Sequence, residues 1–176
     1  EMDNILKDSI DLWQNNCAYE KSILLSGGID SGLLTMILNN NSKVAILIPT
    51  KDREDFIIRT IKYYVSINSF HPIFIGDASS QSSKEKVLNA TKGKIEVYYF
   101  HWENLGDRKT LIKLAEKANL TNITNYCAFH GDDDFFVSES LSKCAEFLDD
   151  NPAYATSQGR AFSLELNGDG PYGKLK

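Results

Sequence analysis

Three consecutive aspartates, Asp132, Asp133 and Asp134, are the residues in this sequence best suited to carry chemistry. They follow Tyr126–Gly131, which is expected to form a short buried strand. Carboxylates at a strand end lie in the crevice where open α/β sheets bind ligands. Two acids separated by one residue can share a hard divalent cation, which prefers oxygen ligands. Such a cation can hold a diphosphate and neutralise it as it leaves. The alternative interpretation is an exposed acidic turn.

Polar side chains also follow two other expected strands. Val44–Ile48 is a continuous aliphatic run, which is typical of a strand buried on both faces of a parallel sheet. Pro49 is expected to end it, and Asp52 comes shortly after. Pro72–Gly76 is the next expected strand, and Asp77 follows it directly. If these strands are neighbours, their polar groups converge on one cleft. The alternative is that each acid caps the helix that comes after it.

Helices and strands alternate along the chain and must position these groups. Apolar residues at helical spacing predict four helices, over residues 53–68, 84–90, 107–118 and 138–148. A further strand is expected over residues 95–100, and the tail offers strands over residues 154–157 and 161–166. His130, in the strand before the acids, is expected to be a buried packing residue rather than a metal ligand. The alternation predicts an α/β domain with a mostly parallel sheet and right-handed crossovers.

The bulk composition narrows the class of protein. A length of 176 residues is enough for one domain with a real core, and the net charge of −5 argues against a nucleic-acid-binding surface. The apolar runs are too short to cross a bilayer, which leaves only peripheral contact with a membrane open. The first 16 residues lack the pattern of a signal peptide. Cys17, Cys127 and Cys144 are widely spaced and are expected to be reduced thiols of a cytoplasmic protein.

The order of these pieces resembles the family 2 glycosyltransferases of the GT-A fold, over roughly residues 43–166. That family opens with an aliphatic strand ending in Pro-Thr or Pro-Ala, as Val44–Thr50 does. Its second strand ends in an acid before a small polar loop, as at Asp77–Ser80. A helix bearing an arginine follows, here with Arg108, and then an aromatic strand that ends in Asp-x-Asp, here Asp132–Asp134. The resemblance implies a GT-A-like, Rossmann-like sheet flanked by helices.

The resemblance also implies an activity. A sugar would pass from a nucleoside diphosphate sugar, with a UDP-sugar expected, to a glycan or a lipid-linked acceptor, and Mn²⁺ or Mg²⁺ would bind the diphosphate. Thr50 and Asp77 would contact the nucleoside, with Asp77 accepting a hydrogen bond from the base. The implied nucleotide-sugar site comprises Pro49, Thr50, Arg53, Glu54, Asp77, Arg108, Asp132 and Asp133. The implied metal ligands are Asp132 and Asp134.

The sequence departs from the family pattern at several places. Gly76 occupies the first of two positions that usually carry acids at the end of the second strand. The catalytic base of the family lies further along the chain, in the half that binds the acceptor, and no residue here is identified as that base. We therefore expect residues 43–176 to form the donor-binding domain, truncated before the acceptor half.

A second motif lies near the start of the chain, in a predicted segment of residues 1–42 that combines a helix with a strand, a turn and a further helix. Its residues are Ser26, Gly27, Gly28, Ile29, Asp30 and Ser31. The string resembles the PP-loop of ATP pyrophosphatases, especially the synthetase part of asparagine synthetases. Glycine-turn N–H groups at a helix N-terminus can cradle a pyrophosphate, and Asp30 can hold Mg²⁺. The alternative functions are therefore an ATP-dependent, amide-forming enzyme and a nucleotide-binding fragment without activity.

Overall fold

The computed structural model describes residues 43–163 and 167. The PP-loop-like motif at residues 26–31 lies outside the described residues, as do the elements expected around it. Four strands alternate with four helices in the described part. The elements are β1 (Val44–Thr50), α2 (Glu54–Ser66), β2 (Ile73–Asp77), α3 (Lys84–Thr91), β3 (Val97–His101), α4 (Asp107–Thr121), β4 (Tyr126–Phe129) and α5 (Ser138–Asp150).

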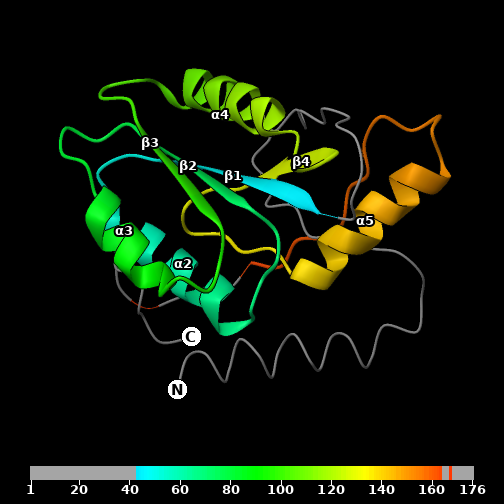
Figure 1. Ribbon diagram of the computed structural model, residues 1–176, viewed down its shortest axis with the longest axis horizontal. Helices are drawn as coiled ribbons and strands as arrows, with labels where there is room; N and C mark the ends of the chain where they lie inside the picture. Colours follow the sequence, from blue (N-terminus) through cyan, green and yellow to red (C-terminus); the bar gives the residue numbers. More distant parts are fainter. Residues whose placement is uncertain (1–42, 164–166, 168–176) are drawn as a thin grey trace.

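The four strands form one parallel sheet in the order β3-β2-β1-β4. The chain leaves β1 toward β2 and β3 on one side and returns to place β4 on the other side, as Figure 1 shows. The strand order therefore reverses between β1 and β4, and ligands of open α/β sheets bind at such a reversal. The expectation of an α/β domain with a parallel sheet is confirmed.

Helices cover both faces of the sheet. α4 lies on one face, where Leu114 and Ala118 pack against Leu47 and Phe74. α2, α3 and α5 cover the other face, over a larger core that includes Ile46. The core is divided between the two faces of the sheet because successive side chains of a strand point to opposite faces. A sheet covered in this way needs apolar residues at every strand position, which explains the continuous aliphatic run in β1.

Two expectations about element ends are wrong. The apolar pattern placed the end of β1 at Pro49, but the strand continues to Thr50, as the family resemblance implied. β4 pairs with β1 only as far as Leu47, so Pro49 has a strand neighbour on one side only, where proline is tolerated. Residues 154–157 form no strand. Within residues 161–166, the described residues 161–163 are not in a strand, and the others lie outside the described part. No helix in the described ranges is both long and apolar enough to cross a bilayer.

Candidate functional site

The carboxylate of Asp132 lies at the centre of a polar cluster at the reversal point of the sheet. The hydroxyl of Thr50, the last residue of β1, donates to Asp132 Oδ2 at 2.7 Å. The guanidinium of Arg53 contacts Asp132 Oδ1 at 3.0 Å. Both carboxylate oxygens therefore have partners from the β1–α2 segment, which is about 80 residues away in the sequence. The expected convergence of the first and last strand ends is confirmed.

Asp132 is buried, and this affects its charge. Burial raises the pKa of its carboxyl group, while the Thr50 hydroxyl and the positive charge of Arg53 act in the opposite direction. The balance is a raised pKa. A buried carboxylate is costly without such partners, so the cluster holds together only as a unit.

Arg53 also binds the second acid of the run. Its guanidinium reaches Asp133 Oδ2 at 2.9 Å, and it stacks over the ring of Phe56 at 4.0 Å from the centroid. Its side chain is 40% exposed, so one face of the guanidinium stays open to solvent. The guanidinium of Arg53 thus bridges two carboxylates at the place where the sequence predicts that a diphosphate binds.

Side chains of helix α2 donate hydrogen bonds to the main chain of the acidic run. The sequence analysis did not single out these residues. Thr60 Oγ1 donates to the main-chain oxygen of Asp132 at 2.7 Å. Arg59 donates to the main-chain oxygen of Asp133 at 2.9 Å. Polar residues within the otherwise apolar stripe of a helix were the available signal, since a buried threonine such as Thr60 must find a hydrogen-bond partner.

His130 is a packing residue, as expected. Its ring is buried, Nδ1 donates to the oxygen of Gly131 at 2.5 Å, and Nε2 accepts from the Tyr64 hydroxyl at 2.8 Å. Both nitrogens are used, so the neutral form with a proton on Nδ1 fits this environment. Burial lowers the pKa of His130 to about 4.

Asp77 ends β2, beside Thr50 in the register of the sheet. Its carboxylate is buried and accepts from the backbone N–H groups of Ser79 at 2.9 Å and Ser83 at 3.3 Å, and from the Tyr99 hydroxyl. Burial alone would raise the pKa of Asp77, but these hydrogen bonds outweigh it and the pKa is lowered. Asp77 is thus an ionised carboxylate held within the loop that follows β2.

Glu54 and Arg108 have different settings. Glu54 opens α2 and joins it to α3, since it accepts from the Ser83 hydroxyl at 2.8 Å and pairs with Lys86 at 2.6 Å. The hydrogen bond from Lys86 is the main reason why the pKa of Glu54 is lowered.

Arg108 is exposed in the first turn of α4, and its part in nucleotide binding stays a prediction.

Gly76 has a packing reason to depart from the family pattern. A Cβ atom at this position would lie 2.4 Å from Thr110 Cγ2 and 3.2 Å from Leu114 Cδ1. Its missing side chain would therefore point at α4, away from the Asp77 carboxylate. An acid cannot occupy this position unless α4 moves.

Comparison with known families agrees with this geometry. Residues 45–173 match the family described as Glycosyl transferase family 2. The chain belongs to this family. The four-stranded parallel sheet with its flanking helices is the GT-A-like fold that the sequence resemblance implied. Glycosyltransferases of this family transfer a sugar from a nucleotide-sugar donor to an acceptor. A search among curated proteins found no match.

The three carboxylates of the acidic run in this glycosyltransferase have different surroundings. Asp133 Oδ1 and Asp134 Oδ2 both lie close to the open side of Gly131, at 2.9 and 3.3 Å from where a Cβ atom would stand. Asp132 is already committed to Thr50 and Arg53. In the described ranges no group of three metal-ligating side chains occurs.

Proposed function

We propose that this glycosyltransferase uses a UDP-sugar as its donor, transfers the sugar to a glycan or lipid-linked acceptor, and depends on Mn²⁺ or Mg²⁺. The observation that carries the proposal is the hydrogen-bonded cluster of Thr50, Arg53 and Asp132. It joins the ends of two strands at the reversal point of the sheet, and Asp77 ends the neighbouring strand. This group of strand ends supplies acceptors for a nucleoside and charge for a diphosphate.

Each residue has a distinct part in this proposal. Asp77 and Thr50 bind the nucleoside, with Pro49 and Glu54 beside them, and Asp132 receives the ribose. Arg53 offers positive charge beside Asp133 at the acidic run, while Arg108 faces the nucleotide from α4. Asp134 is the favoured ligand of the cation, with Asp132 as the second ligand that the sequence implied.

The reaction exchanges one bond at the anomeric carbon. The acceptor hydroxyl oxygen forms a bond to this carbon, the bond from the carbon to the diphosphate oxygen breaks, and the hydroxyl proton leaves to a base. A bound divalent cation supplies positive charge to the departing diphosphate. The guanidinium of Arg53 lies close enough to the acids to add to this stabilisation.

The proposal assigns donor binding to residues 43–176 and treats residues 1–42 as a separate PP-loop-like segment. That segment, with the motif at Ser26–Ser31, lies outside the described residues. ATP chemistry at this motif remains the alternative that the following experiment addresses, together with a fragment that lacks activity.

Thermal unfolding with UDP, GDP and ATP tests the proposal, each nucleotide being added with and without Mn²⁺ or Mg²⁺. A ligand that binds only the folded protein raises the midpoint, by roughly 5–10 °C at about 100 times its Kd. We expect a metal-dependent rise with UDP. A rise with GDP alone would reassign the donor, and a rise with ATP alone would move the site to Ser26–Ser31. No rise with any nucleotide would contradict donor binding.

A further inference from the structure

The loop that follows β2 is closed onto the carboxylate of Asp77. Asp77 Oδ1 accepts from the Ser79 N–H at 2.9 Å, and Oδ2 accepts from the Ser83 N–H at 3.3 Å and from the Tyr99 hydroxyl. Tyr99 lies on β3, the strand next to β2, and not on the loop itself. The position of the carboxylate therefore depends on a side chain that the sequence analysis did not include in the site.

The Tyr99 hydroxyl closes this loop by donating one hydrogen bond and accepting another. It donates its proton to Asp77 Oδ2 and accepts the N–H of Ser83 at 3.0 Å. Burial and the neighbouring carboxylate raise the pKa of Tyr99, so the hydroxyl keeps its proton at neutral pH. One hydroxyl group thus joins the end of β2 to the residue that precedes α3.

The same loop is held at a second point by β3. His101 Nε2 donates to the main-chain oxygen of Ser79 at 2.7 Å. The Ser79 hydroxyl in turn accepts the N–H of Asp52 at 2.7 Å, in the loop that follows β1. Residues of β3 therefore fix both loops that border the expected nucleoside pocket.

Donors surround the carboxylate of Asp77 closely. An ionised carboxylate has about four lone-pair positions. Two on Oδ2 are taken by Tyr99 and Ser83, and one on Oδ1 is taken by Ser79. The hydroxyl of Ser79 is a further donor to this carboxylate, so a ligand N–H group would share an acceptor oxygen with Ser79.

We propose that Tyr99 is a positioning residue that orients the Asp77 carboxylate to receive the N–H group of a nucleotide base. This inference rests on the proposed function, because it takes a uridine nucleotide as the ligand. Tyr99 acts through Asp77 and does not itself touch the nucleotide. It makes base recognition depend on β3, a strand that supplies no residue to the acidic run.

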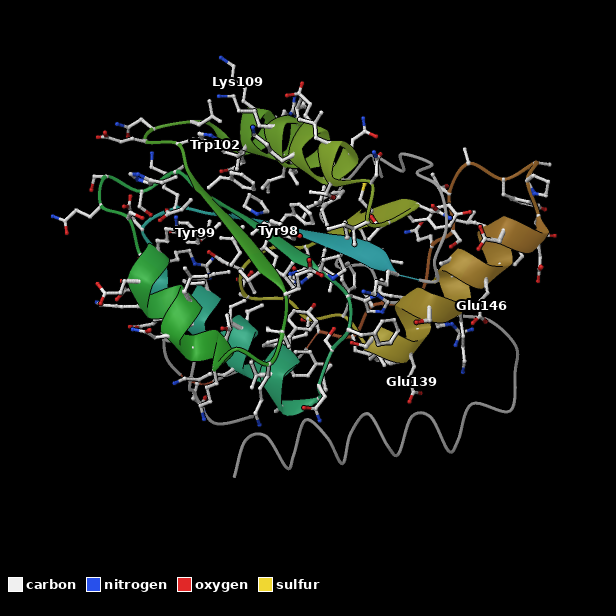
Figure 2. The ribbon with its side chains drawn as sticks, viewed as in Figure 1. Tyr98, Tyr99, Trp102, Lys109, Glu139 and Glu146 are labelled. Atoms are coloured by element: carbon white, nitrogen blue, oxygen red, sulfur yellow. The ribbon has the colours of Figure 1, made fainter. Side chains whose placement is uncertain are left out.

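Tyr99→Phe tests the inference, because it removes the hydroxyl and keeps the ring in the core. Tyr98→Phe is the matched control. It removes a hydroxyl from the adjacent residue, where the hydroxyl donates to the exposed Glu96 at 2.5 Å, and the Tyr98 ring stacks on Phe74, on the opposite face of the sheet. Both tyrosines are labelled in Figure 2.

Binding is measured by calorimetry in the presence of Mn²⁺, with UDP and with pyrophosphate, which has no base. We expect Tyr99→Phe to weaken UDP binding roughly tenfold, as the loss of a hydrogen bond to a charged group does. Pyrophosphate binding should stay within twofold, and Tyr98→Phe should bind both ligands like the wild type. Hydrogen exchange of the Ser79 and Ser83 amides in the ligand-free protein should accelerate in Tyr99→Phe alone.

The outcomes separate this inference from the proposed function. Wild-type protein that binds UDP, together with a Tyr99→Phe variant that binds it equally well, would overturn the role of Tyr99 and leave the proposed donor standing. Equal losses for UDP and pyrophosphate would also overturn it, since they would show a general structural defect. Wild-type protein that binds no UDP would overturn the proposed donor, and this inference with it.

Discussion

Asp132 illustrates how a buried charge can be kept at a ligand site. Its two oxygens accept from Thr50 and contact Arg53, and its main-chain oxygen accepts from Thr60. These three partners come from β1, from the turn after it and from α2. The desolvation cost of the carboxylate is therefore met by groups that the fold brings together before any ligand binds. Asp134 differs, since no hydrogen bond to its carboxylate is seen within the described ranges, and its proposed role as a metal ligand can be tested separately.

At the residue scale, Asp134→Asn should remove most of the metal dependence of UDP binding. The change replaces a charged oxygen ligand by a neutral amide of the same shape, so we expect at least a tenfold loss of the gain in UDP affinity that Mn²⁺ provides. UDP affinity without metal should not change. Calorimetry measures both values, and the electron paramagnetic resonance signal of free Mn²⁺ reports metal binding directly. Asp150→Asn makes the same charge change at the exposed end of α5 and should have no effect. Full Mn²⁺ dependence in Asp134→Asn would rule out this ligand.

At the element scale, the spacing between α4 and β2 depends on Gly76. At the end of β2, Asp77 lies toward the loop on one face of the sheet. Gly76 presents only a hydrogen atom to α4 on the other face. The helix can then pack Thr110 and Leu114 directly onto the strand. The same residue type that breaks the family pattern thus lets α4 pack closely against the strand end that presents Asp77.

Gly76→Ala should destabilise the protein by about 1–3 kcal/mol, because the added methyl group meets Thr110 Cγ2 at 2.4 Å. Thr110→Ser removes that methyl group and keeps the hydroxyl that donates to the Gly106 oxygen at 3.2 Å. Urea unfolding of the two single variants and of Gly76→Ala/Thr110→Ser forms a double-mutant cycle. We expect the double variant to recover a large part of the loss. Purely additive effects would show that the clash with Thr110 is not the cause.

The sequence predicted most elements of this fold, because apolar spacing is a local signal. The four helices and four strands of the described part were expected close to their observed bounds. The end of β1 was missed, since tolerance of Pro49 depends on where β4 stops pairing. The contributions of Thr60 and Tyr99 were missed for a similar reason. Their partners, Asp132 and Asp77, lie 72 and 22 residues away, and no local pattern encodes such pairs.

At the scale of the whole molecule, the free energy of unfolding should fall as the pH drops below 6.5. The pKa of His130 is lowered to about 4 by burial, so the unfolded chain takes up this proton first, near pH 6.5. The contribution of neutral His130 to the free energy of unfolding is therefore complete above pH 6.5 and is lost as the pH falls toward 4. His71 is buried as well, and its lowered pKa acts in the same direction.

The size of this effect is about 3 kcal/mol for His130, from the separation of the two pKa values. Urea unfolding at pH 7 and pH 4.5 measures it, and His130→Asn should lose less stability between these values than the wild type does. The ring signals of His130 in NMR spectra should not shift between pH 7 and pH 5.5. A full titration with a midpoint near 6.5 would contradict the buried, neutral state.

The bond between Thr50 and Asp132 spans 82 residues of sequence, and this has a consequence for the order of events on the ribosome. β1 and β2 can meet soon after they emerge, but three helices and three strands lie between Thr50 and its partner Asp132. At about 5–20 residues per second, this interval is roughly 4–16 s. The nascent chain thus presents the first half of the donor cleft without the second, and we expect that it acquires nucleotide binding only when β4 has joined the sheet.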